Sequence, residues 1–219
     1  MKDYGNEMVL VVPKRFLTKD KYKYEDVVKL IDYYSVFRFR NEVELDFDLR
    51  QIIPYCILKC GDKYFATKRL AGDPRLTGGY SIGTGGHVNK DDVNKKLDAT
   101  TIDNCIIREL TEETTLTKKD LPKEFKFVES FVDNSNEVSQ VHLCLLYLVE
   151  VNKECKIKET DKLEGLWLSK EELTDEIYNS FESWSKIAAD IIGFKPIKKR
   201  ATKNTNSKSS TGTKKGTAK

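Results

Sequence analysis

The sequence predicts an α+β domain with a mixed β-sheet, and three observations lead to this fold class. Apolar runs typical of strands occur both before and after a segment with helical spacing of apolar residues. Residues 76–87 hold five of the chain's twelve glycines and separate the two groups of strands. Amphipathic helical segments close the domain. Strands, a glycine-rich turn, a helix, further strands and closing helices together favour a mixed sheet covered by helices.

The N-terminal third predicts a strand, a helix and a hairpin. Residues 8–13 (MVLVVP) are a short apolar run that ends at a proline. Residues 24–34 have helical apolar spacing, whereas 37–50 fit a strand or a loop equally well. The strands 51–58 and 64–69 flank a tight turn at Gly61-Asp62, where glycine supplies the positive φ that such a turn requires.

The middle and the end of the chain continue this pattern. The glycine-rich residues 76–87 let the backbone pass close to another element or a ligand. Beyond them we expect an exposed insertion over 89–97, a helix over 101–114 capped by Asp98, Thr100 or Thr101, and strands over 124–132 and 138–151. A short strand at 166–168 precedes a helix begun by a Ser169–Glu172 capping box, and 182–194 is a further helix.

Composition predicts one domain, residues 1–195, and a disordered basic tail, residues 196–219. The tail from Lys195 has nine Lys or Arg and no acidic residue, so residues 1–194 carry −6 of the chain's net +3. The sequence has no apolar stretch of the roughly 20 residues that span a bilayer and no apolar signal-peptide core. Five scattered cysteines indicate free thiols in a reducing cytoplasm. We therefore expect a cytoplasmic protein with no membrane partner.

The hexapeptide 108–113 (RELTEE) is the strongest candidate for chemistry. On a helix, Glu109, Glu112 and Glu113 share one face within a turn, where like charges repel. Mg²⁺ or Mn²⁺ would turn this repulsion into binding, because hard divalent cations take carboxylate oxygens and keep waters for a phosphate ligand. A solvated face with an Arg108–Glu112 surface pair explains the hexapeptide alone equally well.

The surroundings of the hexapeptide resemble the Nudix hydrolases. Residues 108–116 (RELTEETTL) match the second half of the family signature except for Thr115, which stands in a glycine position. Gly86 lies 22 positions before Arg108, eight more than in the signature, and Thr100 occupies the place of the first Glu. The segments VLVVP, IPYCILKCGDKYF, LTGGYSIGTGGHVN, DNSNEVSQVHLCLLY, DKLEGLWLSKEEL and ESWSK are similar to a subgroup described as predicted Nudix phosphoesterases, in which the Gly-Gly-His loop precedes a lengthened segment.

The resemblance implies a Nudix fold and a role for each matching residue. Glu109, Glu112 and Glu113 would coordinate Mg²⁺ or Mn²⁺, and Arg108 would orient the carboxylates. Glu113 is the first choice for the group that also accepts the proton of the attacking water, and Glu164, expected in a loop, is the second. Candidates for the missing first Glu are the acidic residues of the lengthened segment, Asp91, Asp92 and Asp98.

Contacts to substrate are expected from the glycine loop and two arginines before it, namely Gly85, Gly86, His87, Arg69 and Arg75. His87 has two interpretations, a phosphate contact or a structural bond that fixes the loop, and the structural role is favoured. For the arginines a surface position is the more frequent outcome. His142, in an apolar strand, is expected to be a core histidine with a satisfied ring.

The implied function is a metal-dependent hydrolase that cuts the phosphoanhydride of a nucleoside diphosphate linked to another moiety. One alternative is a catalytically weak Nudix fold that binds or sequesters a nucleotide. Another is an RNA-directed, decapping-like hydrolase whose basic tail binds nucleic acid, although solubility is the simpler role of the tail. A small nucleotide-type substrate is the expected partner, and the sequence leaves the oligomeric state, including a homodimer, open.

Overall fold

Strand β3 (Leu49–Cys60) is the centre of the fold because four other strands pair with it: β1 (Met8–Pro13), β4 (Lys63–Arg69), β6 (Thr84–Gly85) and β8 (His142–Glu150). The computed structural model describes residues 3–19, 21–71 and 78–197. Strand β8 runs parallel to β3 along its whole length, and the other strand pairs are antiparallel. The sheet is completed by β2 (Val36–Phe39), β5 (Tyr80–Ser81), β7 (Lys126–Phe131) and β9 (Leu163–Leu168).

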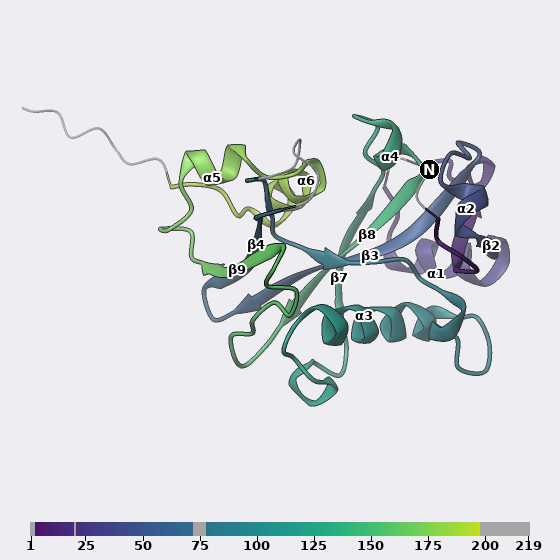
Figure 1. Ribbon diagram of the computed structural model, residues 1–219. Helices are drawn as coiled ribbons and strands as arrows, with labels where there is room; N and C mark the ends of the chain where they lie inside the picture. The colour runs from purple at the N-terminus through teal and green to yellow at the C-terminus, as the bar shows by residue number, and fades with distance from the viewer. Residues whose placement is uncertain (1–2, 20, 72–77, 198–219) are drawn as a thin grey trace, which may run out of the picture.

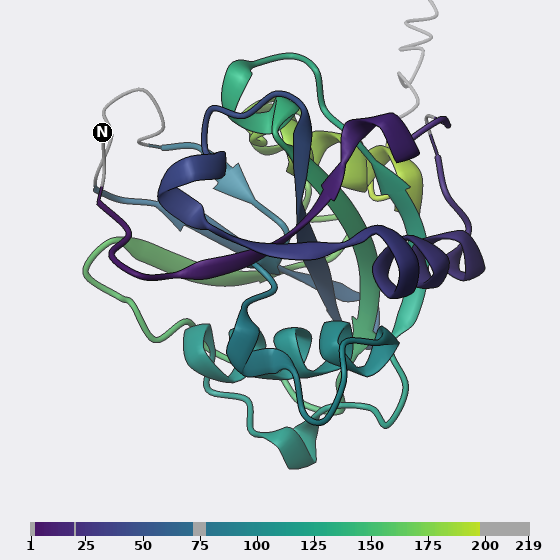
Figure 2. The same ribbon diagram turned by 90° about the vertical axis from the view of Figure 1, so that its right-hand side faces the viewer.

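Helices cover both faces of this mixed sheet, as the sequence predicts (Figure 1). Helices α1 (Tyr24–Tyr34) and α3 (Ala99–Glu113) pack on one core, and α6 (Ser183–Ile192) packs on the other. Successive side chains of β3 point to opposite faces of the sheet and so contribute to both cores. Ile52 and Leu58 face α1 and α3, while Tyr55 and Ile57 face α6. Figure 2 shows α1 beside the sheet and α3 across its lower face.

Several elements confirm the sequence-based predictions. Strand β1 and helix α1 have the expected bounds. The β3–β4 hairpin turns at Gly61, whose φ of 59° is the positive value expected there. Helix α6 ends at Gly193 in the left-handed conformation with φ of 68°. The undecided segment 37–50 divides into the end of β2, the short helix α2 (Arg40–Val43), a loop and the start of β3.

The prediction of a strand from residue 138 is wrong at its start. Residues Glu137–Gln140 form a short helix, α4, and the strand begins at His142. The cause is local side-chain chemistry, because the Asn136 side chain accepts a hydrogen bond from the Ser139 backbone N–H at 2.9 Å and caps a helical turn.

The predicted helix start at Ser169 is also wrong. The reciprocal hydrogen bonds of the capping box exist, with Ser169 N donating to Glu172 Oε2 at 2.9 Å and Glu172 N donating to Ser169 Oγ at 3.4 Å. They close a turn, and the helix α5 (Asp175–Asn179) begins later, capped by the side chain of Thr174. A capping box therefore fixes a turn even where the chain does not continue as a helix.

The insertion before α3 is more ordered than an exposed loop. It contains a short 3₁₀ turn, Lys90–Asp92, whose last residue is only 3% exposed, whereas residues 94–96 are exposed as expected. Of the three predicted caps, Asp98 is the one used, and it accepts the Thr100 N–H at 2.9 Å. Helix α3 thus begins two residues earlier than predicted.

Some sequence-based predictions fall on residues 72–77 and 198–219, which lie outside the described residues. Arg75 and nearly all of the predicted disordered tail belong to this group. The five cysteines are free thiols, as expected. No helix in the described part of the chain has the length and apolar character needed to cross a bilayer.

Candidate active site

Helix α3 brings two of the three predicted carboxylates to one cavity. Glu109 and Glu113, one turn apart, line a cavity of about 880 Å³ together with Gly85 and Gly86 of the glycine loop. The helix is held in this orientation by its opposite face, which packs into the core through Ile102, Cys105, Ile106 and Leu110. The amphipathic pattern of α3 therefore places its carboxylates under the loop.

Glu112 lies apart from this cavity. Its side chain is 60% exposed and its carboxylate is 3.4 Å from Arg108 Nη1, which is the surface pair expected from the spacing alone. A second cavity of about 380 Å³ is lined by Glu112, Glu113 and Glu159. Glu113 consequently lies between both cavities, with a carboxylate neighbour on each side.

Burial and like charge raise the pKa of Glu113 to about 7. Burial is the larger cause, and the carboxylates of Glu109, Glu159 and Glu112 add to it. Among the described residues, no hydrogen bond or ion pair compensates the Glu113 carboxylate. Burial also raises the pKa of Glu109, although Arg108 opposes this shift. Glu113 is the carboxylate with the greatest need of a counter-ion.

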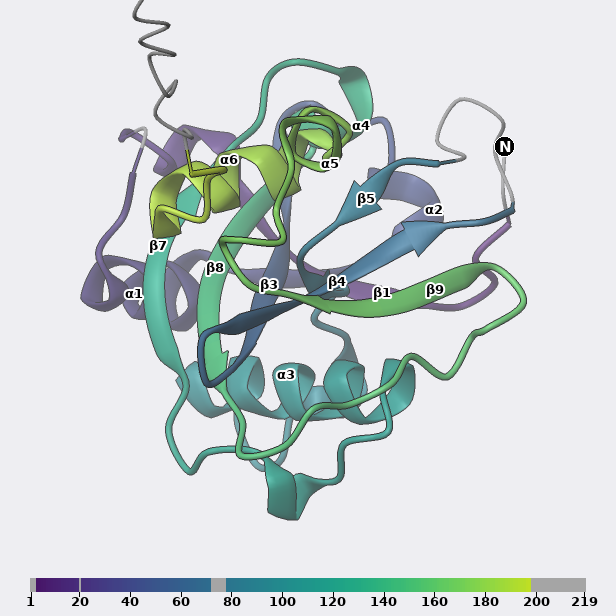
Figure 3. The ribbon, with the colours of Figure 1, turned by 90° about the vertical axis from the view of Figure 1, so that its left-hand side faces the viewer.

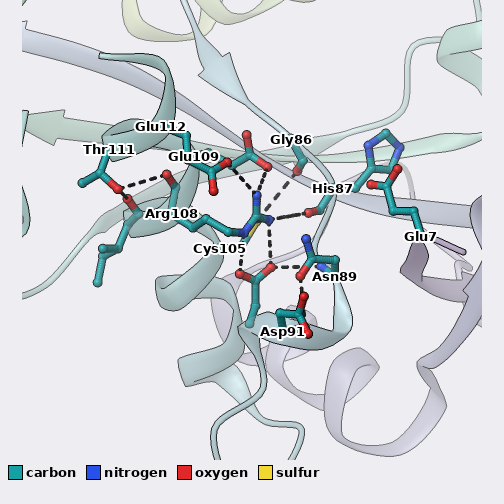
Figure 4. Close-up of polar contacts among 12 residues, drawn as sticks. Glu7, Gly86, His87, Asn89, Asp91, Cys105, Arg108, Glu109, Thr111 and Glu112 are labelled. Atoms are coloured by element: carbon teal, nitrogen blue, oxygen red, sulfur yellow. Dashed lines mark hydrogen bonds and ion pairs between the residues drawn. The ribbon is translucent and has the colours of Figure 1, made fainter. Parts of the chain in front are cut away.

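Arg108, on helix α3, forms hydrogen bonds to the glycine loop, to the insertion and to Glu109 of its own helix. Its Nε and Nη2 atoms bind the two oxygens of Asp92 at 2.8 and 3.0 Å, and Nη2 also donates to the His87 backbone oxygen at 2.9 Å. Its Nη1 atom donates to Glu109 Oε1 at 2.7 Å. Figure 4 shows the guanidinium between the Glu109 carboxylate and the His87 backbone oxygen. Arg108 thereby fixes the Glu109 side chain at the cavity.

Asp92 is the acidic residue of the insertion that reaches the site. Its side chain is 2% exposed and forms a bidentate pair with Arg108, the arrangement that gives a carboxylate–guanidinium contact most geometric specificity. Asp91 is exposed, and Asp98 caps α3. Sequence reasoning named all three as candidates, and the fold brings only Asp92 to Arg108. Its burial could not be recognised from a polar segment alone.

The ring of His87 in the glycine loop lies against the ring of His142 in strand β8. Its Nε2 atom is 3.3 Å from Nε2 of His142, and both rings line the large cavity. Burial, followed by the charge of Arg40, lowers the pKa of His87 to about 2, so the ring is neutral at physiological pH. A neutral imidazole holds the loop against β8 but brings no positive charge to a phosphate.

The other predicted site residues lie elsewhere. Arg69 is not part of the cavity lining, but it donates to Glu182 Oε1 at 3.3 Å, and Glu182 lines the cavity. Glu164 lies in strand β9 opposite Lys68 and not in a loop, and its side chain is exposed. Glu159, which sequence reasoning missed, is the residue of that region whose charge reaches Glu113. Glu159 lies far from α3 in the sequence, so no local pattern predicts that the two come together.

Gly86→Ala is expected to reduce activity with a smaller loss of stability than a clash with backbone would cause. A Cβ atom at Gly86 would lie 2.1 Å from Glu109 Oε1, so the carboxylate would have to shift at the cost of its bond to Arg108 Nη1. A displacement of about 1 Å can cost about 10²-fold in rate. The matched variant Gly85→Ala would place Cβ 2.2 Å from the Pro54 backbone oxygen, so it should lower the free energy of unfolding by about 1–3 kcal/mol. Chemical denaturation and steady-state kinetics separate the two effects, and wild-type turnover by Gly86→Ala would contradict the placement of Glu109.

Comparisons with known proteins indicate the family of this chain. No family model matches the chain. The chain is 30% identical over 204 residues to Protein YmaB of Bacillus subtilis (strain 168), covering 85% of this chain and 98% of that protein. It is 31% identical to Tm1382, which has been assigned to the Nudix hydrolases, with a TM-score of 0.72 over 85% of this chain and 98% of that chain. DR0079 from Deinococcus radiodurans shares the fold at 14% identity, with a TM-score of 0.51 over 85% and 98% of the two chains.

The sequence resemblance, the fold and the carboxylate helix beneath a glycine loop thus point to one family. The match to Tm1382 extends over 98% of that protein at 31% identity, so the shared features concern whole domains and not a single motif. This chain belongs to the Nudix hydrolases.

Proposed function

We propose that the protein is a metal-dependent hydrolase that cleaves the phosphoanhydride bond of a nucleoside diphosphate linked to another moiety. Residues 1–195 would form the catalytic domain. The observation that supports this proposal most is the placement of Glu109 and Glu113 on consecutive turns of α3, in the wall of one large cavity beneath the Gly85–Gly86 backbone.

The chemistry of the carboxylates fits a divalent ion. Nudix hydrolases generally use divalent metals, and the oxygen donors of Glu109 and Glu113 suit Mg²⁺ or Mn²⁺. Among residues 3–19, 21–71 and 78–197, no three His, Cys, Asp or Glu side chains form a ready-made metal cage. Mg²⁺ binds through one or two carboxylates and completes its shell with waters and substrate phosphates, so two glutamates on one helix can hold it. Glu112 would take part from the side of the second cavity.

The side chains of the site would then divide the work. When bound, the metal ion would neutralise charge on the phosphate oxygens and make a water a better nucleophile. Glu113, whose carboxylate faces Glu109, Glu112 and Glu159, would accept the proton of that water, and its pKa would fall from the metal-free value of about 7 beside a bound cation. Arg108 keeps Glu109 oriented through its bond of 2.7 Å, and the glycine loop leaves room for substrate oxygens close to the backbone.

A substrate panel tests this function. Purified protein with Mg²⁺ or Mn²⁺ is incubated with ADP-ribose, NADH, UDP-sugars, dinucleoside polyphosphates, nucleoside triphosphates and capped RNA. We expect at least one nucleoside diphosphate derivative to release a nucleoside monophosphate. If no compound is cleaved, or if wild type and Glu113→Gln yield the same product at the same rate, the proposed function is wrong.

Without metal, the charge of Glu113 is expected to destabilise the fold as the pH rises. Its pKa lies at about 7 in the folded state against an ordinary value of 4.5, so the folded chain holds the proton more tightly than the unfolded chain. The unfavourable contribution is absent below pH 4.5, grows as the pH rises to about 7 and is complete above it. A divalent ion at 100 times its Kd should stabilise the fold by about 2.7 kcal/mol, a total that includes the relief of this repulsion.

Thermal unfolding at pH 5 and pH 8 measures this effect. In EDTA, the melting temperature of Glu113→Gln should rise relative to that of wild type as the pH is raised from 5 to 8, because the variant has no carboxylate to ionise at this position. With excess Mg²⁺ at pH 8, wild type should be the more stable of the two proteins. A stability difference that does not change with pH or with Mg²⁺ would show that Glu113 is an ordinary solvated carboxylate.

A further inference from the structure

A second group of exposed side chains lies at helix α1, apart from both cavities. The chain leaves β1 through a 3₁₀ turn, Lys14–Phe16, and returns to the start of α1 (Figure 2). The ring of Phe16 stacks on the ring of Tyr34 at the end of α1, with a centroid distance of 4.2 Å and an interplanar angle of 24°. Neither residue lines either cavity, and α1 lies at one edge of the molecule with β9 towards the opposite edge (Figure 3). This face therefore has no part in the proposed hydrolysis.

The stacked pair continues at both ends into a row of planar groups. The guanidinium carbon of Arg15 lies 4.8 Å from the centre of the Phe16 ring, and the Tyr33 ring lies 6.4 Å from the Tyr34 ring. Tyr33 is 75% exposed, the largest value among the large hydrophobic side chains of the described residues, and Tyr34 is 44% exposed. Packing within the chain leaves these ring faces open, so a planar group of a ligand can stack on them.

Positive charge accompanies this row of planar groups. Residues 14–23 hold five Lys or Arg and one Asp, whereas residues 1–194 together carry −6. Lys29 precedes Tyr33 by four residues on α1, so the two side chains are neighbours on the helix surface. Lys14, Arg15 and Lys29 are exposed, and none of the three forms an ion pair with a described residue. Three cations are thus available to an anionic ligand.

The acidic side chains of this region are mostly paired with other lysines. Asp26 of α1 binds Lys19 at 2.8 Å, and Glu129 of β7 binds Lys21 at 2.7 Å. Asp32 is the acidic residue in the last turn of α1, and it is exposed. A single negative charge near the rings does not offset three cations, so the face attracts anions although the domain as a whole is acidic.

A ligand that fits this face carries both planar groups and closely spaced negative charges. Single-stranded nucleic acid has both, because its unpaired bases stack on aromatic rings and guanidinium groups while its phosphates bind Lys and Arg. A duplex already stacks its bases on one another, and an anionic membrane offers charge without planar groups.

We propose that the 3₁₀ turn Lys14–Phe16 and the last turns of α1 form a binding surface for single-stranded RNA or DNA. Bases stack on the rings of Tyr33 and Tyr34, and phosphates bind Lys14 and Lys29. The binding goes beyond the proposed function, since it requires neither the metal-type carboxylates nor hydrolysis.

Fluorescence anisotropy with labelled oligo(U) and oligo(dT) of about ten nucleotides tests the contribution of the rings. The full chain is used in EDTA, so the result does not depend on hydrolysis, and the basic residues 195–219 are common to all proteins compared. Tyr33→Ala should weaken binding of at least one of the two strands about tenfold, whereas Tyr33→Phe keeps the ring and should bind as wild type does. A strand of the same length with abasic positions should bind wild type and Tyr33→Ala equally.

The salt dependence of the same binding tests the contribution of the cations. Each phosphate contact of a single strand adds about 0.7 to the slope of log affinity against log salt, so Lys14→Gln with Arg15→Gln should reduce the slope by about 1.4. The matched control is Lys118→Gln with Lys119→Gln, which removes two neighbouring exposed cations from another 3₁₀ turn, Lys118–Asp120. This control should keep the slope of wild type.

Photocrosslinking with an oligonucleotide that contains 4-thiouridine locates the contact by mass spectrometry. We expect crosslinks on the peptides that hold Phe16, Tyr33 and Tyr34. Crosslinks confined to residues 195–219 or to the large cavity, equal affinities of wild type and Tyr33→Ala, or binding to phosphatidylserine vesicles but not to oligonucleotides would overturn the proposal. A wild-type dimer in analytical ultracentrifugation that Tyr33→Ala dissociates would also overturn it, because a second copy of the chain would then cover this face.

Discussion

Glu113→Gln is expected to lower kcat by about 10²- to 10⁴-fold, the range that a positioned general base contributes. The amide keeps the shape of the side chain but can neither accept the proton of a water nor bind a cation with a full charge. In the absence of metal the same change should stabilise the fold at pH 8, because it removes a buried carboxylate that faces Glu109, Glu112 and Glu159. Steady-state kinetics with the best compound of the panel, combined with thermal unfolding, measures both effects.

Two variants make this result specific. Glu171→Gln changes an exposed glutamate outside both cavities and should leave kcat unchanged. Glu164→Gln compares the two candidate bases, and the exposed position of Glu164 in β9 leads us to expect a far smaller effect than at Glu113. A larger loss from Glu164→Gln than from Glu113→Gln would transfer the proton-accepting role to Glu164.

Arg108→Met is expected to reduce both stability and activity. The change leaves the Asp92 carboxylate, whose side chain is 2% exposed, without its bidentate partner. Breaking a buried ion pair from one side costs about 3–5 kcal/mol, because an uncompensated charge remains buried. The variant also frees the His87 backbone oxygen and the Glu109 carboxylate, so the loop and the catalytic helix lose their common anchor.

A double-mutant cycle with Asp92→Asn tests this explanation. Adding Asp92→Asn to Arg108→Met removes the buried, unpaired charge of the Asp92 carboxylate. The double variant should therefore regain part of the lost free energy of unfolding, as measured by urea unfolding. Activity should stay low, since Glu109 still lacks its partner. If the two changes add without any coupling, Asp92 and Arg108 do not form the pair described here.

The sequence predicted those elements whose signals are local. Helix α1 shows its apolar period over three turns, and the β3–β4 hairpin carries a glycine at the one position that needs a positive φ. The errors occurred where a side chain competes with the regular pattern. Asn136 caps a helical turn inside an apparent strand, and the Ser169–Glu172 pair closes a turn without starting a helix.

In the candidate site, too, the features that depend on local spacing were predicted and those that depend on tertiary packing were not. The spacing of Glu109, Glu112 and Glu113 predicted a shared face, and helix α3 confirms the helical part of that prediction. Their different surroundings depend on tertiary packing: the glycine loop covers Glu109 and Glu113, whereas Glu112 remains in solvent. Asp92 and Glu159 join the site from segments 16 and 46 residues away from Arg108 and Glu113, and no local periodicity connects such partners.

A titration with Mn²⁺, followed by the EPR signal of free Mn²⁺, tests the metal role of Glu109 and Glu113 most directly. Wild type should bind at least one Mn²⁺ that Mg²⁺ displaces, and hydrolysis should rise with occupancy and disappear in EDTA. Glu109→Gln with Glu113→Gln should lose both the binding and the hydrolysis. Hydrolysis that persists in EDTA, or Mn²⁺ binding that is unchanged in the double variant, would contradict a metal platform on helix α3.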